Sequence, residues 1–457
     1  MDTKREKSQY ELAFMMEARG EASKAVNKGI EMSMTLKETK GQVENEFIME
    51  EVCKTENVNE AYRRVRSNKG SAGVDGMTVE KLGKYLQENW PEIKQQLLKG
   101  IYQPKPVRGV EIPKPNGGVR KLGIPTVVDR FIQQALLQVL EKRWDKTYSA
   151  HSYGFRPGKR AHQAIAVAQK YIEEGNKFVV DIDLEKFFDR VNHDKLMGQI
   201  AKRIKDKRVL KLIRGYLNAG VMENGVVVRT AEGTPQGGPL SPLLSNLYLD
   251  ELDRELERGG HRFVRYADDC NIYVKSERAG QRVMEGMRKY ISQKLKLKIN
   301  ESKSAVSKPQ YRKFLGFSFT FGKTIKRRIA LGSLQRFKSE IRRLTQRTRG
   351  IKPEKMIEQL RKYLEGWSGY FGYCQTPSVL QGLEEWIRRR LRSAIWKQWK
   401  RGVNRYAQLR KMGIGKRLAA QTAGSVHGPW RISNSPALAI AVSNVYLKSL
   451  GLPSLMT

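Results

Sequence analysis

Cysteine and long apolar runs are both scarce in this chain of 457 residues. Its three cysteines, Cys53, Cys270 and Cys374, lie far apart and form no Cys-x-x-Cys pair, which argues against a structural zinc site and for a reducing compartment. No apolar run approaches the ~20 residues that a membrane-spanning helix needs. The N-terminus also lacks the apolar segment of a signal peptide. We therefore expect a cytoplasmic protein with no membrane partner.

Acidic residues are the second shortage. The chain has 47 Asp and Glu against 86 Lys and Arg, so its formal net charge is +39. The imbalance is strongest near the C-terminus, where none of the 72 residues after Glu385 is acidic and 14 are Lys or Arg. A surface this basic repels itself unless a polyanion binds to it, and nucleic acid is the polyanion that the composition favours.

Composition also divides the chain into segments. Residues 1–46 are polar and of mixed charge, and we interpret them as a mobile N-terminal extension. Residues 47–322 alternate between helical and strand patterns. From residue 323 the chain becomes basic and helical, because residues 323–417 contain 26 Lys and Arg, six Glu and no Asp. Contact with polyphosphate explains such a segment best.

An acidic pair lies at the end of a predicted strand. Residues 178–183 read Phe-Val-Val-Asp-Ile-Asp. Alternate side chains of a strand share a face, so Asp181 and Asp183 should lie on the same face. An Asp that follows a strand is also a common helix N-cap, which could account for Asp183 alone.

A second acidic pair lies at the tip of a predicted hairpin. Two runs rich in aromatic and β-branched residues flank the tight centre Ala267-Asp268-Asp269. Asp is common in turns, but adjacent carboxylates repel each other unless a cation lies between them. If this hairpin and the strand before Asp183 are neighbours in one sheet, the three acids form a cluster. Such a cluster would bind Mg²⁺, and two ions would serve an in-line displacement at phosphate.

Cations gather on another predicted hairpin. Residues 107–112 and 119–124 are expected to form short strands, joined by the turn Pro115-Asn-Gly-Gly118. This hairpin carries Arg108, Lys114 and Arg120. If these cations face the carboxylate site, they would suit a triphosphate.

Taken together, the motifs resemble those of one protein family. Tyr266-Ala-Asp-Asp269 and the strand that ends at Asp183, followed five residues later by Phe188, are similar to the palm of reverse transcriptases. Further blocks match in the expected order, namely Phe155-Arg-Pro-Gly158, Gly233-Thr-Pro-Gln-Gly-Gly238 and Phe314-Leu-Gly-Phe317. Over about residues 50–450 the chain resembles the bacterial group II intron reverse transcriptase/maturases.

The resemblance implies an α+β fold. We expect a right-hand polymerase whose fingers and palm, an antiparallel sheet plus helices, occupy residues 47–322. An α-helical thumb, the X (maturase) domain, would follow at 323–402, and residues 403–457 would be a basic DNA-binding region. Many relatives end in an endonuclease domain with paired Cys residues, whereas no cysteine follows Cys374 here. We therefore expect no second-strand DNA cleavage.

The resemblance also implies roles for individual residues. Asp183 and Asp268 would be the principal ligands of two Mg²⁺ ions, and Asp269 would support them. Phe188 would exclude a ribose 2′-OH, and Gln236 would contact the nucleotide near its sugar. The remaining residues expected to bind the dNTP triphosphate or nucleic acid are all basic: Arg108, Lys114, Arg120, Arg156, Arg388, Arg389, Arg390 and Arg392.

The last four arginines lie on a predicted amphipathic helix. Leu383, Ile387 and Leu391 recur at helical spacing and should form its buried stripe. The arginines at 388, 389, 390 and 392 are expected to turn largely outward, where they could contact RNA phosphates.

The expected function is RNA-directed DNA polymerisation, using dNTPs, an RNA template and a DNA primer. The protein would also bind group II intron RNA to promote splicing and retrohoming into target DNA, as a monomer or weak dimer in a nucleoid-associated ribonucleoprotein.

Three alternatives stay open: an RNA-directed RNA polymerase, a mainly non-catalytic maturase, and a reverse transcriptase repurposed for host defence or another cellular role. The bulky ring of Phe188 argues against the first. The retained acids argue against the second, because clustered carboxylates are costly without a metal.

Overall fold

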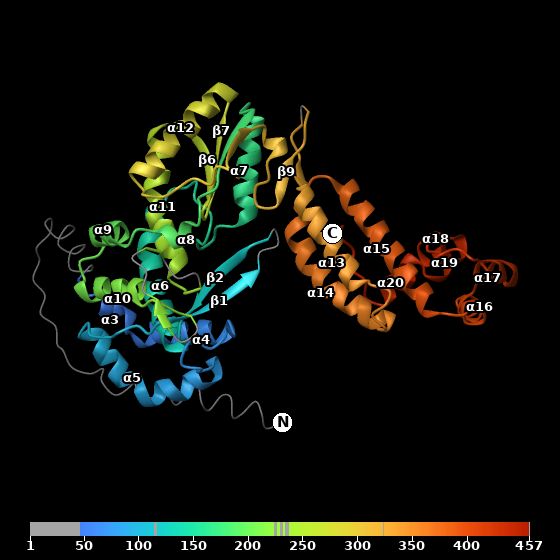
Figure 1. Cartoon of the computed structure of the whole chain (residues 1–457), viewed down its shortest axis with the longest axis horizontal. Helices are drawn as coiled ribbons and strands as arrows, with labels where there is room; N and C mark the ends of the chain where they lie inside the picture. Colours follow the sequence, from blue (N-terminus) through green and yellow to red (C-terminus); the bar gives the residue numbers. More distant parts are fainter. Residues whose placement is uncertain are drawn as a thin grey trace, which may run out of the picture. The chain divides into compact units, whose positions relative to one another are not determined.

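The computed structural model describes residues 46–113, 117–223, 226–228, 232–233, 237–322 and 324–456. The chain divides into two compact units (Figure 1). Unit 1 comprises the described residues up to 164 together with 180–272 and 278–306, and unit 2 comprises 165–179, 273–277 and the residues from 307 onward. Across the described residues, every helix is either too short or too polar to cross a bilayer.

Unit 1 is built around the buried helix α6 (Val127–Trp144). Thr126 caps this helix, because its Oγ1 accepts from the Asp129 backbone N–H at 3.1 Å and donates to Asp129 Oδ2 at 2.6 Å. The other helices of this unit are α3 (Ile48–Val52), α4 (Thr55–Ser67), α5 (Leu82–Leu98), α8 (Phe187–Arg190), α9 (His193–Arg203), α10 (Lys207–Asn218), α11 (Ser241–Arg258) and α12 (Glu277–Gln293).

The predicted basic hairpin is confirmed as part of a four-stranded sheet, of order β2-β1-β4-β5. Its strands are β1 (Val107–Pro113), β2 (Val119–Ile124), β4 (Val221–Glu223) and β5 (Val226–Val228). Strands β1 and β2 are antiparallel, with Arg108 opposite Ile124 and Ile112 opposite Arg120. On its other edge β1 pairs in parallel with β4. The loop that contains Lys114 lies outside the described residues.

A second sheet carries the acidic motifs and has the strand order β6-β7-β3-β8. Its strands are β3 (Phe178–Ile182), β6 (Arg262–Tyr266), β7 (Asp269–Val274) and β8 (Ala305–Ser307). The predicted strand and hairpin are therefore confirmed, and β7 lies directly beside β3. Lys186, not Asp183, is the N-cap of the following helix α8, so a capping role does not explain Asp183.

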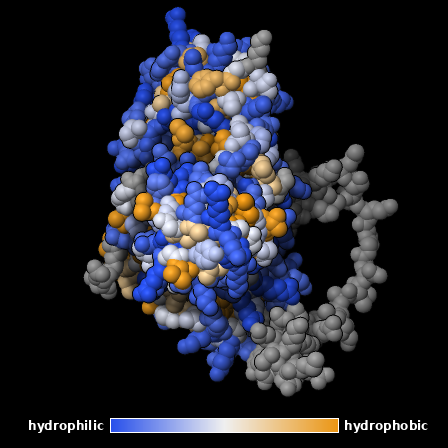
Figure 2. Space-filling model, turned by 90° about the vertical axis from the view of Figure 1, so that its right-hand side faces the viewer, coloured by the Kyte–Doolittle hydropathy of each residue, from blue (hydrophilic) through white to orange (hydrophobic). Residues whose placement is uncertain are grey.

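Unit 2 is mostly helical, with one small sheet. It contains α7 (Ala161–Glu173), β9 (Phe317–Phe319), β10 (Arg327–Ile329), α13 (Leu331–Leu344), α14 (Pro353–Phe371), α15 (Pro377–Gln398), α16 (Gly402–Lys411), α17 (Lys416–Ala423), α18 (Pro429–Ile432), α19 (Pro436–Ala441) and α20 (Asn444–Ser449). The predicted stripe of Leu383, Ile387 and Leu391 is buried in its core. On the face drawn in Figure 2, hydrophilic side chains predominate and hydrophobic ones form small separate groups.

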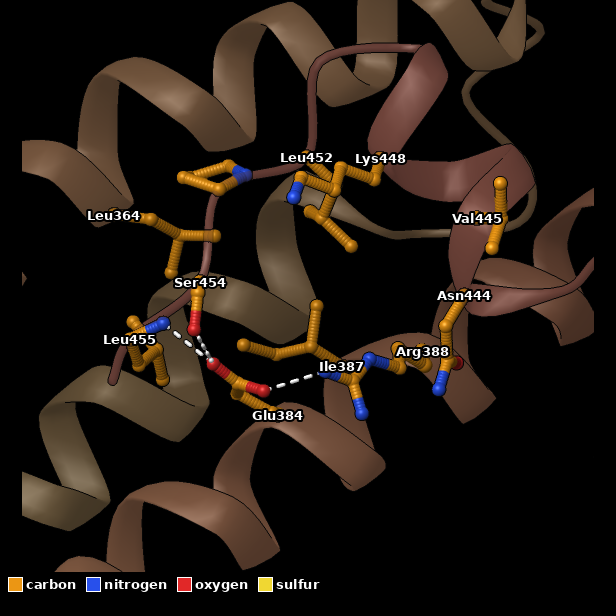
Figure 3. A pocket seen from close by; sticks show the side chains of 11 residues that line it. Leu364, Glu384, Ile387, Arg388, Asn444, Val445, Lys448, Leu452, Ser454 and Leu455 are labelled. Atoms are coloured by element: carbon orange, nitrogen blue, oxygen red, sulfur yellow. Dashed lines mark hydrogen bonds and ion pairs between the residues drawn. The ribbon is translucent and has the colours of Figure 1, made fainter. Parts of the chain in front are cut away.

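A buried carboxylate on α15 holds the last described residues of the chain (Figure 3). Glu384 accepts from Ser454 Oγ at 2.6 Å and from the Leu455 backbone N–H at 2.5 Å, and it forms an ion pair with Arg388 at 2.5 Å. Burial alone would raise the pKa of the Glu384 carboxyl, but these donors together hold that pKa below its usual value. The tail from Leu452 to Leu455 thereby closes one side of a pocket of about 220 Å³.

This anchor predicts a pH-dependent stability. Because the pKa of Glu384 is depressed in the folded state, its contribution is present above the unfolded-state pKa and is lost as pH falls through the folded-state pKa. Glu384→Gln should lower the free energy of unfolding of unit 2 by about 1–3 kcal/mol at pH 7, and by less near pH 4. Chemical denaturation at both pH values measures this difference.

Glu385→Gln is the matched control, since this neighbouring carboxylate is exposed and accepts from Gln381 of the same helix. It should change the stability little at either pH. An equal loss for Glu384→Gln at pH 7 and pH 4 would contradict a role for the ionised carboxylate.

Candidate active site

Asp183 follows β3 and is held by the segment that precedes β8. Its backbone N–H donates to Ser304 Oγ at 2.9 Å, and its carbonyl accepts from the Asn300 backbone N–H at 2.8 Å. The same segment brings Lys303 Nζ to 3.4 Å from Asp183 Oδ2. Sequence reasoning assigned no role to Lys303, because nothing in the motif predicts that it lies beside a strand 120 residues earlier.

Asp268 lies at the turn between β6 and β7. Burial raises the pKa of its carboxyl, its own backbone N–H lowers it, and the negative charge of Asp183 raises it further. The cations Arg120 and Lys303 act in the opposite direction. The carboxylates of Asp183 and Asp268 therefore repel each other, as expected for residues beside the neighbouring strands β3 and β7.

Asp269, the third acid of the predicted cluster, is the first residue of β7, and its supporting role stays a prediction. Its side chain is exposed, whereas Asp268 is half-buried. Among the described residues, no group of three His, Cys, Asp or Glu is close enough to hold a metal ion. The site thus offers two carboxylates, those of Asp183 and Asp268.

Asp181 lies on β3, two residues before Asp183, and its carboxylate has a hydrogen-bond partner of its own. With its amide nitrogen turned toward β3, Asn271 donates to Asp181 Oδ1 at 2.9 Å. This hydrogen bond links β3 to β7, and Asp181 is therefore not part of the Asp183–Asp268 pair.

Two of the predicted triphosphate ligands lie on the basic hairpin. Arg120 is exposed on β2, and its charge lowers the pKa of Asp268. Arg108 on β1 is half-buried, and its Nε is buried with no hydrogen-bond partner among the described residues. A buried donor of this kind is costly to leave unpaired. Lys114 and Gln236 lie outside the described residues.

Phe188 lies one turn beyond Asp183 and is half-buried. Its ring meets the buried ring of Phe187 edge-on, with centroids 5.2 Å apart. Gly233, at φ +96°, packs against the backbone carbonyls of Phe188 and Asp189. Phe188 thus follows Asp183 by five residues, with its ring packed on Phe187.

Arg156 is not available as a nucleic-acid ligand, and that prediction is corrected here. Its side chain is only 6% exposed, and its guanidinium donates to the side chain and carbonyl of Asp145 and to the carbonyls of Ser149 and Ser152. These bonds close the loop of residues 149–156.

The arginines of α15 are half-buried and bind protein groups, so they are not simply turned outward as expected, and their contact with RNA phosphates stays a prediction. The guanidinium of Arg389 stacks on Trp430 at 4.1 Å, and Arg390 Nε donates to Thr345 Oγ1 at 2.6 Å. Arg388 pairs with Glu384, and Arg392 Nε donates to the carbonyl of Val442 at 2.9 Å. Burial lowers the pKa of both Arg390 and Arg392. The helix stripe predicted which face is apolar, but not that long arginine side chains fold back onto protein partners.

A carboxylate pair at neighbouring strand ends, with a hairpin tip and flanking cations, defines the palm of a polymerase that acts on nucleic acid. The family model for reverse transcriptase (RNA-dependent DNA polymerase) matches residues 112–319, and that for the group II intron maturase-specific domain matches residues 334–413.

Curated relatives agree with these matches. The chain is 34% identical over 316 residues to protein YkfC of Escherichia coli, covering 60% of this chain and 82% of that protein. It is 32% identical to the group II intron-encoded protein LtrA of Lactococcus lactis, covering 58% of this chain and 56% of LtrA. It is also 32% identical to the putative COX1/OXI3 intron 2 protein of Saccharomyces cerevisiae, covering 52% of this chain and 28% of that protein.

The chain belongs to the group II intron reverse transcriptase/maturase family. The predicted α+β polymerase fold, the helical maturase domain and the enzyme class, an RNA-directed DNA polymerase, are thereby confirmed. Reverse transcriptases of this kind use divalent metal ions, and the maturase domain implies binding of intron RNA.

The Asp268 carboxylate predicts an unusual effect on stability. Its pKa is raised in the folded state, so the stability present below the unfolded-state pKa is lost as pH rises through the folded-state pKa. At pH 7.5 the metal-free protein thus carries the cost of an ionised, half-buried carboxylate beside Asp183. Asp268→Asn should raise the melting temperature of the metal-free protein by on the order of 1–3 °C. Added Mg²⁺ should stabilise the wild type and not the variant.

Asp194→Asn serves as the control, because its carboxylate is exposed and pairs with Arg214 at the surface. It should leave both the metal-free melting temperature and the Mg²⁺ effect unchanged. A metal-free Asp268→Asn protein that melts below the wild type, or an equal Mg²⁺ effect on both, would contradict the shared site.

Proposed function

We propose that this chain copies RNA into DNA with Asp183 and Asp268 as the ligands of two Mg²⁺ ions. The observation that carries the proposal is the position of both carboxylates at the ends of adjoining strands, where each charge bears on the other. Mg²⁺ is bound in proteins through one or two carboxylates together with substrate phosphates, so this donor set fits it. When bound, such ions lower the pKa of a primer 3′-OH and stabilise the departing pyrophosphate.

The chain's own cations would hold the rest of the substrate. Lys303 Nζ lies 3.4 Å from Asp183 Oδ2. Its positive charge would reduce the repulsion between the two carboxylates when no metal ion is bound. Arg120 and Arg108 on the basic hairpin would bind the triphosphate of the incoming dNTP, because a guanidinium can donate two parallel hydrogen bonds to phosphate oxygens. Lys114 and Gln236 belong to the same proposal, as does a supporting, less direct role for the exposed Asp269.

Phe188 would select the sugar. Its half-buried ring lies five residues after Asp183 and packs on the buried Phe187. A ring fixed at that point leaves no space beneath a ribose 2′-OH, so dNTPs would be accepted and ribonucleotides rejected.

The remaining partners follow from the basic helices of unit 2. We assign residues 47–322 to fingers and palm, 323–402 to the thumb and maturase domain, and 403–457 to a DNA-binding region. Group II intron RNA, the RNA template with its DNA primer, and target DNA would be the nucleic-acid ligands. The protein would act in a ribonucleoprotein on the bacterial nucleoid, as a monomer or weak dimer.

Because the α15 arginines already bind protein groups, we infer that RNA phosphates also contact other cations of unit 2. Lys411, Lys416 and Arg417 are exposed where α16 ends and α17 begins. No acidic residue occurs anywhere after Glu385 that could neutralise them. We therefore place part of the phosphate contact on these three residues, which we call the α16–α17 cations.

Extension of a DNA primer on an RNA template tests the polymerase function and the sugar selection together. The wild type should add dNTPs in Mg²⁺, and Asp268→Asn should not. Phe188→Ala should lower the preference for dNTP over ribonucleotide in kcat/KM by roughly 10- to 200-fold, because one side-chain contact contributes about 1–3 kcal/mol to such discrimination.

Phe188→Tyr keeps the ring and should keep the preference, so it controls for general damage to the site. Unchanged sugar preference in Phe188→Ala would place the selecting side chain elsewhere. Extension by Asp268→Asn at the wild-type rate would reject the polymerase site itself.

The α16–α17 cations predict the salt dependence of RNA affinity. Each phosphate contact contributes a slope of roughly −0.7 to −0.9 in log K against log salt concentration. Replacing Lys411, Lys416 and Arg417 together by Gln should therefore flatten the slope by about 2 to 3, while extension on a short preformed primer–template changes less. Filter binding to intron RNA at four salt concentrations measures the slope.

The matched control replaces three exposed cations of unit 1 that already pair with glutamates, namely Arg258 with Glu255, Arg288 with Glu301 and Lys289 with Glu285. It removes the same charge and should leave the slope nearly as in the wild type. Parallel slopes for wild type and both triple variants would show that the α16–α17 cations do not contact phosphate.

A further inference from the structure

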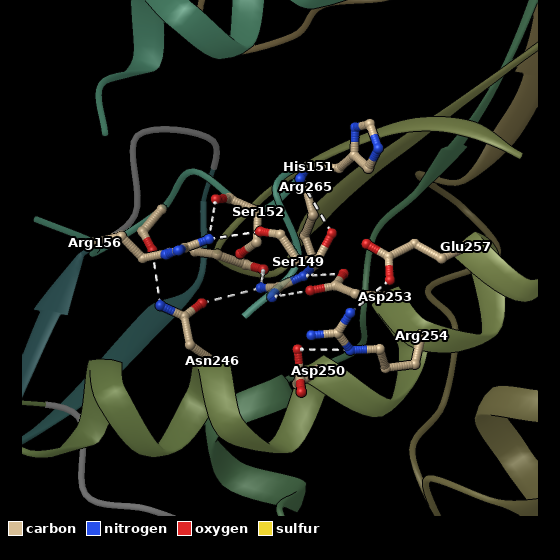
Figure 4. Close-up of polar contacts among 12 residues, drawn as sticks. Ser149, His151, Ser152, Arg156, Asn246, Asp250, Asp253, Arg254, Glu257 and Arg265 are labelled. Atoms are coloured by element: carbon tan, nitrogen blue, oxygen red, sulfur yellow. Dashed lines mark hydrogen bonds and ion pairs between the residues drawn. The ribbon is translucent and has the colours of Figure 1, made fainter. Parts of the chain in front are cut away.

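Directly behind the turn that carries Asp268 lies a fully buried guanidinium, that of Arg265 (Figure 4). Arg265 on β6 and Asp253 on α11 are both 0% exposed. Nε and Nη2 of Arg265 donate to the two carboxylate oxygens of Asp253, at 2.7 Å and 2.5 Å. This bidentate pair fastens the hairpin strand to the helix without any contact with solvent.

The third nitrogen of the same guanidinium reaches the turn itself. Nη1 of Arg265 donates to the carbonyl of Ala267 at 2.9 Å and to Asn246 Oδ1 at 3.1 Å. Ala267 has φ +57°, a left-handed conformation that residues other than glycine rarely adopt. The bonded carbonyl belongs to the peptide group that joins Ala267 to Asp268. Arg265 thus stabilises an unfavourable backbone conformation one residue before the catalytic carboxylate.

A loop holds the same turn from another side. Asn246 Nδ2 donates to the carbonyl of Gly154 at 2.8 Å, and a Cβ added at Gly154 would collide with the backbone nitrogen of Ala267. The backbone of Arg265 bonds to this loop as well, since its N–H donates to the carbonyl of His151 and its carbonyl accepts from Tyr153, both at 2.9 Å. A helix, a strand and a loop therefore meet at one guanidinium, as Figure 4 shows.

We propose that Arg265 is a positioning residue for polymerisation, which fixes the peptide between Ala267 and Asp268 and so aims the Asp268 carboxylate at the site shared with Asp183. This inference deepens the proposed function and rests on its assignment of Asp268. Only a guanidinium can serve all of these acceptors, because it has five donors in one rigid plane, whereas an ammonium group has three on a point charge. Mg²⁺ demands near-ideal ligand geometry, so a small displacement of Asp268 is enough to slow the reaction.

The test compares Arg265→Lys, which keeps the buried charge, with Asn246→Ala, which leaves the Arg265–Asp253 pair in place. In single-turnover extension with Mg²⁺, the rate should fall by about 100-fold for Arg265→Lys and about 10-fold for Asn246→Ala. The dNTP concentration for half-maximal rate should stay within about threefold of the wild type. Hydrogen exchange, measured on the metal-free protein without nucleic acid, should be faster in both variants for peptides that cover residues 262–274.

Arg208→Lys is the matched control. Arg208 also makes two bonds to a buried aspartate, Asp206, at 3.0 Å and 2.9 Å, but it joins α10 to α3 through Glu50. Its variant should lose thermal stability as Arg265→Lys does, yet keep the extension rate and the exchange of residues 262–274.

Extension rates within about threefold of the wild type for both variants would overturn the proposal. It would also be overturned if Arg265→Lys and Arg208→Lys lose equal melting temperature and Arg265→Lys loses no more extension rate than Arg208→Lys. If Arg265→Lys does not fold, Asn246→Ala decides alone by the same criteria. Faster exchange with an unchanged rate overturns the positioning role only, whereas extension by Asp268→Asn overturns the proposed function instead.

Discussion

Repulsion between two carboxylates governs the structure of the palm. Asp183 and Asp268 come from segments 85 residues apart in the chain, and the strand order β6-β7-β3-β8 places them at adjoining strand ends. Nothing about folding alone favours that placement, because burial and the charge of Asp183 both raise the pKa of Asp268. Lys303 and Arg120 reduce the cost without removing it. A site that tolerates this cost is suited to bind a divalent cation, which is the use that its family makes of it.

Much of this architecture could be predicted from local sequence pattern. Alternation of apolar and acidic residues predicted β3, and the aromatic runs around Asp268 predicted the hairpin, since each signal lies within a few consecutive residues. The apolar stripe of α15 was equally visible. Sequence pattern does not predict which partners long side chains reach. Arg156 closes a loop and Arg390 binds Thr345, whereas the sequence predicts nucleic-acid binding for both. Lys303 was missed for the same reason, because its partner Asp183 is distant in sequence.

The two units use charge differently. Unit 1 buries ionic groups and pairs them, as in Arg265 with Asp253, so that the backbone next to the site is held in one conformation. In unit 2 the arginines of α15 are bound to carbonyls, hydroxyls and rings, which joins α15 to the helices around it. Exposed cations occur in unit 2 both before and after Glu385, and those after it lie in a stretch without acids, where they remain available to a polyanion. The large positive charge of the chain therefore has both a structural and a binding component.

The claim that Asp183 and Asp268 form one site is tested most directly by a double-mutant cycle in primer extension with Mg²⁺. Residues that act as a unit are strongly non-additive, whereas independent residues contribute additively. We predict that Asp183→Asn, Asp268→Asn and the double variant are impaired to nearly the same extent. A double variant whose loss of rate is the product of the two single losses would show that the carboxylates act separately, and would contradict the account.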